Sequence, residues 1–251
     1  MNNLNKNKNQ FNHYDLYPFD YLSKKDEANI KQKQAKPFIE FINKYADKSC
    51  EIAEIGCGPG RSTLYMTEMG LSVTALDLSN YSLELAKKRS PKGKFILGDN
   101  ANLPFSSNSF DIVISDGVLH HTNNPKKSFE ENSRILKTGG KMYLSIYRKY
   151  GKYYFIYHII GFWIRYFNKF YLGNFLIEKL LIPFYFLVHL LRSEKNINNR
   201  GAKNLFYDYF LTPIVIFKTK KEILSWSKRL NLKLKKYFKK SKNSHIFFFE
   251  K

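Results

Sequence analysis

The sequence predicts an α/β fold built on a Rossmann-like, doubly wound and mostly parallel sheet, and three observations support this prediction. Short apolar segments that suit buried strands alternate with longer segments that suit helices. A glycine-rich turn at residues 56–60 joins the first such strand to a helix. Each of four strand-like segments ends close to an acidic residue, at the end where open α/β sheets bind ligands.

The N-terminal part leads into the first strand. Residues 1–12 are rich in Asn and Lys and are predicted to be disordered. The aromatic segment 14–21 is expected either to cover a ligand or to pack on the sheet edge. Residues 28–45 predict a helix that is interrupted at Pro37.

The sequence of the glycine-rich turn differs from two common nucleotide-binding motifs. Its alternate glycines allow a sharp bend and a close approach of ligand to backbone. A dinucleotide fingerprint would place its third glycine at position 61, where this chain has Arg61. The turn also lacks the lysine of a phosphate-binding P-loop. A different adenosine ligand is therefore favoured.

Three further parallel strands are expected to bring acidic residues to the same edge of the sheet. The strands are predicted at residues 73–77, 95–99 and 110–116, with a fifth at about 141–145 and a helix at 80–88. Simpler roles stay open for single residues. Asp77 or Ser79 could cap the helix, and Asp99 could be a turn residue.

Taken in order, these motifs resemble those of the class I S-adenosylmethionine-dependent methyltransferases, of the small-molecule type 11 kind. The resemblance covers about residues 50–147 and more loosely 219–250. It implies an antiparallel hairpin of strands at 232–238 and 245–249, after a helix at 220–230. It implies S-adenosylmethionine as the cofactor, with Asp77 on the ribose and Asp99 near the adenine amino group. The implied cofactor-binding residues are Glu54, Gly56, Cys57, Gly58, Gly60, Asp77, Leu78, Asp99, Asn100, Ala101 and Asp116.

Methyl transfer to a hydroxyl usually benefits from a base. The first candidates are His120 and His121, of which one is expected to face the cofactor site, and Asp208. Asp116 and Tyr207 are further candidates. A helix-start or core role for the histidine pair also stays open. No metal site is expected.

An aromatic-rich insertion follows the fifth strand. Residues 155–170 have helical spacing, a second helix is predicted at about 173–191 with a bend at Pro183, and 193–203 are expected to form a surface loop. The uncharged runs 153–164 and 180–191 are too short to cross a membrane. A lid over a hydrophobic acceptor, a membrane-interface segment and core packing remain as alternatives.

The chain is expected to divide into four parts. These are an N-terminal extension and cap helix at 1–48, a cofactor-binding core at 49–148, a helical insertion at 149–218, and a helix with strand hairpin at 219–251. Its two cysteines, Cys50 and Cys57, open and follow one predicted strand, about 20 Å apart, so no disulfide between them is expected. Free thiols and no signal peptide predict a cytoplasmic protein, with contact at a membrane surface left open.

Three function classes remain open for this chain, whose formal net charge is +21. The favoured class is a methyltransferase acting on a small, hydrophobic or lipid-linked acceptor, with oxygen as the favoured atom to receive the methyl group. A methyltransferase of nucleic acid or protein would explain the charge. However, Gly117-Val118-Leu119 stands where base-methylating enzymes carry an Asn-Pro-Pro-Tyr type motif. A non-catalytic binding or membrane-associated module is the third class, and the intact acids argue against it.

Overall fold

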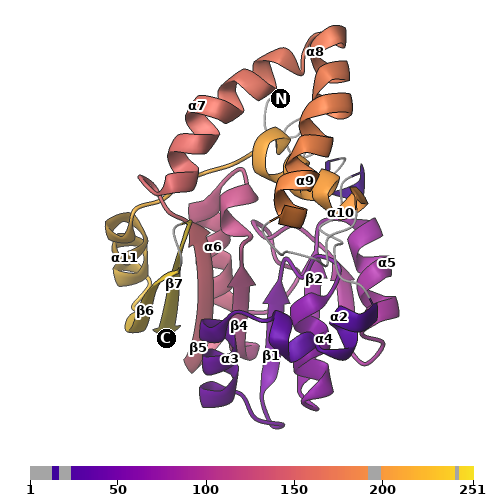
Figure 1. The fold of residues 1–251 in the computed structure, drawn as a ribbon. Helices are drawn as coiled ribbons and strands as arrows, with labels where there is room; N and C mark the ends of the chain where they lie inside the picture. Colours follow the sequence, from indigo (N-terminus) through magenta and orange to yellow (C-terminus); the bar gives the residue numbers. More distant parts are fainter. Residues whose placement is uncertain (1–12, 17–23, 192–198, 241–242) are drawn as a thin grey trace.

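The computed structural model describes residues 13–16, 24–191, 199–240 and 243–251. In this part of the chain seven strands form one sheet, in the order β3-β2-β1-β4-β5-β7-β6 (Figure 1). The strands are β1 (Glu51–Ile55), β2 (Ser72–Asp77), β3 (Lys94–Leu97), β4 (Phe110–Asp116), β5 (Leu136–Tyr147), β6 (Lys233–Lys240) and β7 (Ser244–Glu250). The first five pair in parallel, and β7 pairs antiparallel with both β5 and β6. The predicted fold class is therefore confirmed.

Helices and helical turns connect these strands. They are α2 (Lys24–Ala28), η1 (Ile30–Lys33), α3 (Lys36–Tyr45), α4 (Arg61–Glu68), α5 (Asn80–Arg89), η2 (Leu119–His121), α6 (Pro125–Ile135), α7 (Lys152–Phe167), α8 (Tyr171–Leu176), η3 (Ile177–Leu181), α9 (Ile182–Leu191), α10 (Asn199–Phe206), η4 (Tyr207–Leu211) and α11 (Lys220–Arg229). Residues suited to capping set several of their starts, among them those of α5, α6 and α11. The Ser79 hydroxyl caps α5, and Thr219 and Glu222 form a reciprocal capping box at α11.

The sheet is apolar on both faces because its side chains alternate between two clusters. In β4, Ile112 and Ile114 pack with α3 and α4, whereas Val113 points to the opposite cluster with α6 and α11. Phe248 and Phe249 of β7 divide in the same way. Helices on both faces and buried strands between them match a doubly wound sheet, and they leave the carboxyl ends of the parallel strands free for a site.

Three element predictions differ from the structure. Pro37 does not interrupt a long helix; it occupies the first turn of α3, where its missing N–H costs no hydrogen bond. The predicted loop 193–203 is wrong from Asn199 on, because α10 begins there; residues 192–198 lie outside the described part. The glycine pair Gly139-Gly140 lies within β5 rather than in a turn before it.

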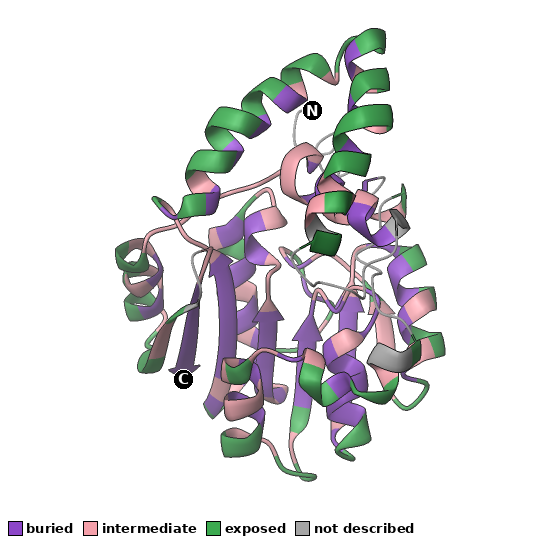
Figure 2. Cartoon of the chain, in the orientation of Figure 1, coloured by how far each residue is buried: buried purple, intermediate pink, exposed green. Residues whose placement is uncertain are grey.

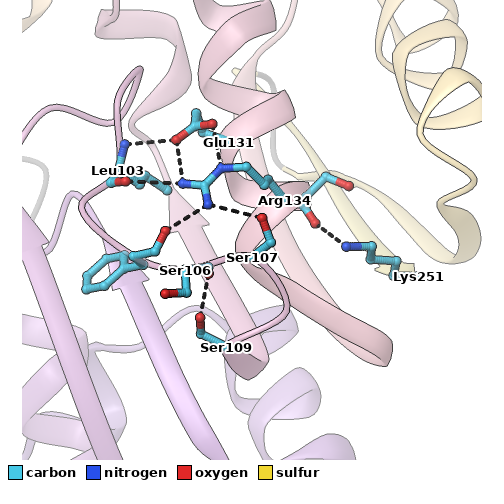
Figure 3. A network of polar contacts seen from close by, with 9 residues as sticks. Leu103, Ser106, Ser107, Ser109, Glu131, Arg134 and Lys251 are labelled. Carbon is cyan, nitrogen blue, oxygen red and sulfur yellow. Dashed lines mark hydrogen bonds and ion pairs between the residues drawn. The ribbon is translucent and has the colours of Figure 1, made fainter.

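A polar network fixes the loop that follows β3 (Figure 3). The Arg134 guanidinium on α6 donates to the carbonyl oxygens of Phe105 at 2.7 Å and Leu103 at 3.1 Å. It also pairs with Glu131, which accepts a hydrogen bond from the Leu103 N–H at 2.9 Å. Since this loop continues directly from Asp99, the network holds one wall of the cleft described below.

The helices of the insertion form a projecting hairpin beyond the carboxyl ends of the parallel strands (Figure 1). We call residues 152–191 the aromatic hairpin. Its second arm runs without a break from α8 through the π-helical η3 into α9, so the distortion lies just before Pro183. Gly173 makes the turn between the arms tight, since a Cβ there would lie 2.1 Å from the Phe167 carbonyl oxygen.

The second arm of the hairpin is longer than the uncharged runs that the sequence analysis judged too short to cross a membrane. By length and composition alone, the stretch Tyr171–Val188 could cross a membrane, with a mean hydropathy of 1.4, although buried core helices meet the same criterion. Only 17% of this stretch is buried, so it is not a core helix. The sequence suggested a shorter run, 180–191, because Glu178 and Lys179 separate it from the apolar residues before it.

Candidate functional site

A cleft of about 650 Å³ lies at the carboxyl ends of β1, β2, β4 and β5. Twelve predicted site residues line it together, namely Glu54, Gly56, Cys57, Gly58, Asp77, Leu78, Asp99, Asn100, Ala101, Asp116, His120 and His121, and Asp208 joins them from η4. A cleft of this size suits one small-molecule ligand with its cofactor. The four acids do share one cleft, as the motif order predicts.

The glycine-rich turn is shaped so that its backbone borders the cleft. Gly56 has φ +78°, and a Cβ there would lie 2.3 Å from Val118 Cγ2. Gly58 has φ +52°, and no heavy atom of the described chain lies within 4 Å of the position its Cβ would take. Gly60, also predicted to bind the cofactor, is not in the cleft lining. It packs instead on Ala86 and begins α4.

Asp77 anchors this turn as well as facing the cleft. One carboxylate oxygen accepts the Gly58 N–H at 2.7 Å and the other accepts the Ser79 N–H at 2.9 Å. Capping of α5 falls to Ser79, so Asp77 is not the cap. Burial raises the pKa of the Asp77 carboxyl. Because a carboxylate offers about four acceptor positions, Asp77 retains capacity for ligand hydroxyls.

Glu54 is buried at the end of β1, where it accepts a hydrogen bond from the Thr63 hydroxyl at 2.5 Å. Loss of hydration raises the pKa of Glu54 to about 8, and the neighbouring Asp116 and Asp77 charges raise it further while Thr63 and Arg61 lower it. Three acids held this close in a buried cleft favour a positively charged ligand, because a cation would relieve their mutual repulsion.

Asn100 carries the clearest sign that the cleft is made for a polar ligand. Its side chain is buried, and within the described chain neither its amide nitrogen nor its amide oxygen has a hydrogen-bond partner. Neighbouring Asp99 accepts the Ala101 N–H at 2.9 Å, so it forms a turn and also lines the cleft. An unpaired buried amide costs stability unless a ligand satisfies it. The open space at Gly58 and the amide of Asn100 both fit an adenosyl cofactor.

His120 and His121 both line the cleft, whereas only one was expected to face it. The His120 ring is fully buried and stacks on Tyr147 at a centroid distance of 3.6 Å. Its Nδ1 accepts the Tyr147 N–H at 3.3 Å, so the ring proton lies on Nε2. Burial lowers the pKa of His120 well below its usual value, which keeps the imidazole neutral.

His121 faces the third catalytic candidate. Its Nδ1 donates to the Ile214 carbonyl oxygen at 2.9 Å, which leaves the lone pair on Nε2. That Nε2 lies 3.9 Å from Asp208 Oδ1, and both side chains are largely buried. Burial lowers the pKa of His121 to about 4 and raises the pKa of Asp208 to about 7. A weakly basic ring and a carboxyl that titrates near neutrality therefore share one edge of the cleft.

The N-terminal segment contributes a wall of the cleft, the first of its two expected roles. Tyr14 lines the cleft and meets the His121 ring edge-on at 6.0 Å between centroids. Asp15 accepts a hydrogen bond from the Ser79 hydroxyl, which ties this segment to the start of α5. Tyr17, Phe19 and Tyr21 lie outside the described residues.

Tyr207, considered as a base, does not reach the cleft, and the other candidate groups can be placed as well. The Tyr207 hydroxyl donates to Glu178 in the hairpin and does not line the cleft. Both cysteines are free, in agreement with the prediction that no disulfide joins them, and burial raises the pKa of the Cys57 thiol well above its usual value. Among the described residues, no group of three or more His, Cys, Asp or Glu is placed to hold a metal ion. Cleft residues that the sequence did not single out are Arg61, Arg89, Lys127, Ser145, Tyr147 and Ser244.

Comparison with known proteins identifies the core. Residues 53–144 match the model of the methyltransferase domain family. Over 91 residues the chain is 41% identical to the demethylmenaquinone methyltransferase of Renibacterium salmoninarum, covering 36% of this chain and 38% of that protein. Over 94 residues it is 35% identical to the phthiotriol/phenolphthiotriol dimycocerosates methyltransferase of Mycobacterium tuberculosis, covering 36% of this chain and 35% of that protein. The matched part thus spans well under half of either relative.

Solved structures extend the similarity of fold to most of the chain. A SAM-dependent methyltransferase from Methanosarcina mazei superposes with a TM-score of 0.55 at 18% identity, covering 84% of this chain and 96% of that one. The 1,6-didemethyltoxoflavin-N1-methyltransferase of Burkholderia thailandensis, solved with S-adenosylhomocysteine, superposes with a TM-score of 0.53 at 14% identity, covering 90% and 82%. Together, the family match and the similarity of fold show that residues 53–144 form a methyltransferase domain and that most of the chain has the fold of S-adenosylmethionine-dependent methyltransferases.

Proposed function

We propose that this chain transfers the methyl group of S-adenosylmethionine to a hydroxyl of a small, hydrophobic or lipid-linked acceptor. The observation that carries the proposal is the placement of the His121–Asp208 pair beside four acids in a single cleft. The acids suit the cationic cofactor, and the pair suits an acceptor that must lose a proton.

The chain's own residues account for cofactor binding. Asp77 would accept the ribose hydroxyls, Asn100 and Asp99 would meet the adenine edge, and Glu54 would lie toward the amino group. Gly56 and Gly58 let the backbone approach closely, because neither has a side chain to fill the space. When bound, the cofactor supplies an activated methyl group on a positively charged sulfonium.

His121 and Asp208 would take up the proton that the acceptor loses. Both line the cleft, and the Nε2 lone pair of His121 faces the Asp208 carboxyl. A proton released from the acceptor hydroxyl can pass by way of Nε2 to Oδ1 of Asp208, because the buried carboxylate is the more basic of the two groups. His120, stacked on Tyr147, orients the neighbouring ring rather than accepting this proton.

Two considerations favour a hydrophobic acceptor. The two relatives are named for demethylmenaquinone and for phthiotriol dimycocerosates, which are lipid-like molecules. In addition, the aromatic rings of Tyr14 and Tyr147 line the acceptor side of the cleft. The turn η4 also borders this side, and it is hydrogen-bonded to the aromatic hairpin through Tyr153. A cytoplasmic location stays a prediction.

The test uses the full chain, S-adenosylmethionine labelled on its methyl group, and separate lipid, water-soluble metabolite, RNA and protein fractions of a cell extract. We expect label in a lipid or other organic-soluble product. Asp77→Asn should abolish transfer, whereas Asp111→Asn, at the opposite end of β4, should preserve it. Label confined to RNA or protein, with steep loss of binding as salt is raised, would overturn the small-molecule acceptor. Cofactor binding without any transfer would indicate a non-catalytic module.

A further inference from the structure

The aromatic hairpin exposes apolar side chains along both arms, and Figure 2 shows it as the most exposed part of the molecule. The most exposed of these are Tyr171 (90%), Leu191 (76%), Leu172 (67%), Leu180 (64%), Phe184 (63%) and Ile159 (62%), and Trp163 is exposed as well. Soluble monomers rarely show continuous apolar surfaces of this extent, so the hairpin surface calls for a partner.

The exposed apolar side chains of α7 cover one broad side of the helix. At about 100° per residue, positions 155, 156, 159, 160, 162, 163, 166 and 167 cover roughly half of the helix circumference. The buried positions, Tyr153, Tyr157 and Ile164, occupy a narrow opposite stripe toward η4.

Charged residues in the hairpin are sorted between the inner and outer sides. Arg165 turns inward, where it donates to the carbonyl oxygens of Phe210 and Tyr157 at 3.1 Å each. Glu178 also turns inward and pairs with Lys203 at 2.7 Å. Neither charge would therefore be carried into an apolar layer.

The remaining charges of the hairpin are three exposed lysines, Lys152, Lys169 and Lys179. Lysine side chains beside apolar surface can extend their ammonium groups to lipid phosphates. The formal net charge of +21 favours an anionic surface in the same way and opposes association with a second copy of this chain. Trp163, Tyr166 and Tyr171 are of the residue types that prefer the membrane–water boundary.

The hairpin is tied to the acceptor side of the cleft through η4. The Tyr153 hydroxyl donates to the Tyr209 carbonyl oxygen at 2.7 Å, and Arg165 holds the next carbonyl, that of Phe210. Asp208, one residue before Tyr209, lines the cleft. A surface that holds the hairpin would therefore lie beside the acceptor entrance.

We propose that the aromatic hairpin inserts its outward apolar side chains into the interfacial layer of an anionic lipid bilayer. For the hairpin to cross the bilayer both arms would have to span it, and the 16 residues of α7 reach only about 24 Å of the roughly 30 Å hydrocarbon thickness, although the second arm alone is long enough. The three exposed lysines, Lys152, Lys169 and Lys179, are free to extend toward lipid phosphates beside this apolar surface. This inference concerns attachment and goes beyond the proposed reaction.

The test measures flotation of the full chain with vesicles of phosphatidylcholine, with and without phosphatidylglycerol, in the absence of cofactor and acceptor. We expect about tenfold more bound protein on the anionic vesicles at low salt. The triple variant Ile159→Gln, Phe162→Gln, Leu180→Gln should lose about tenfold of this binding while it retains its circular dichroism spectrum and its affinity for S-adenosylmethionine. A matched triple variant of exposed apolar residues elsewhere, Met69→Gln, Leu97→Gln, Leu234→Gln, should bind as the wild type does.

A second measurement leaves the hairpin unchanged. Trp163 and Trp226 are the two tryptophans, so Trp226→Phe leaves Trp163 as the reporter. Lipids brominated on their acyl chains should quench its fluorescence. No quenching, or no flotation of the wild-type chain, would overturn the inference. So would a dimer that dissociates in the hairpin triple variant while vesicles stay unbound. Because no methyl transfer is measured, these outcomes are separate from those that test the reaction.

Discussion

The Nε2 atom of His121 lies 3.9 Å from Oδ1 of Asp208, and the structure brings these two residues together from η2 and from η4. The ring is fixed because its other nitrogen donates to the Ile214 carbonyl oxygen. Burial separates the two pKa values in the direction opposite to that of an ion pair, to about 4 for His121 and about 7 for Asp208. At neutral pH the ring is therefore uncharged, and the carboxyl of the pair titrates in this range.

The pH dependence of turnover follows from this arrangement. Burial raises the pKa of Asp208, so the pair is free of its proton, and able to accept another, only above about pH 7. We expect kcat/KM for a hydroxyl acceptor to rise as the pH rises toward 7 and to level off above it. Asp208→Asn should remove this rise and slow turnover by roughly 10²-fold or more, and His121→Ala should slow it while cofactor binding survives. Asp111→Asn is the control, and a pH rise that persists in Asp208→Asn would contradict the assignment.

Glu54 should weaken the fold of the cofactor-free protein as the pH rises. Its folded-state pKa of about 8 exceeds its usual value of 4.5, so the folded chain keeps a proton that the unfolded chain releases, and stability falls across that interval. Glu54→Gln can still accept the Thr63 hydrogen bond and should raise the free energy of unfolding at pH 8 by on the order of 2 kcal/mol, with little change at pH 4. The same variant should bind S-adenosylmethionine about tenfold more weakly by calorimetry.

An exposed acid provides the comparison for Glu54. Glu84, which pairs with Lys87 on the surface of α5, can be replaced by Gln without altering the pH profile of stability or the affinity for the cofactor. If Glu54→Gln and Glu84→Gln behave alike in denaturant titrations at both pH values, the buried acid has no special role.

Gly56 and Gly139 allow backbone strain to be separated from steric overlap. Both have left-handed backbone angles, φ +78° and +80°. An added Cβ at Gly56 would lie 2.3 Å from Val118 Cγ2, whereas at Gly139 it would meet no described heavy atom within 4 Å. Gly139→Ala should cost only about 1 kcal/mol of stability, because strain alone is added. Gly56→Ala should cost more and weaken cofactor binding at least about tenfold, as measured by thermal unfolding and calorimetry. Equal effects of the two substitutions would show that the contact with Val118 is unimportant.

The sequence predicted most of the sheet and of the cofactor side of the cleft because both depend on local pattern. A parallel strand between two helical layers is continuously apolar, and its end is marked by an acid or a glycine, as at Asp77 and Asp116. Chain order then fixes which strand ends meet, so the acids could be placed in one cleft before any coordinates.

The remaining features depend on contacts between distant segments, which no local pattern encodes. The approach of Asp208 to His121 requires η4 to fold back over the cleft. Tyr14 reaches the same place from the N-terminal segment. The π-helical η3 carried Glu178 inward, so a charge that seemed to interrupt an apolar helix is neutralised by Lys203.

Tyr153 and Arg165 of α7 donate hydrogen bonds to two neighbouring carbonyl oxygens, those of Tyr209 and Phe210. Both belong to the short turn that presents Asp208. These two hydrogen bonds therefore couple the position of α7 to that of the turn carrying Asp208. Through this coupling, a helix of the projecting hairpin contributes to the spacing of two proton-binding groups.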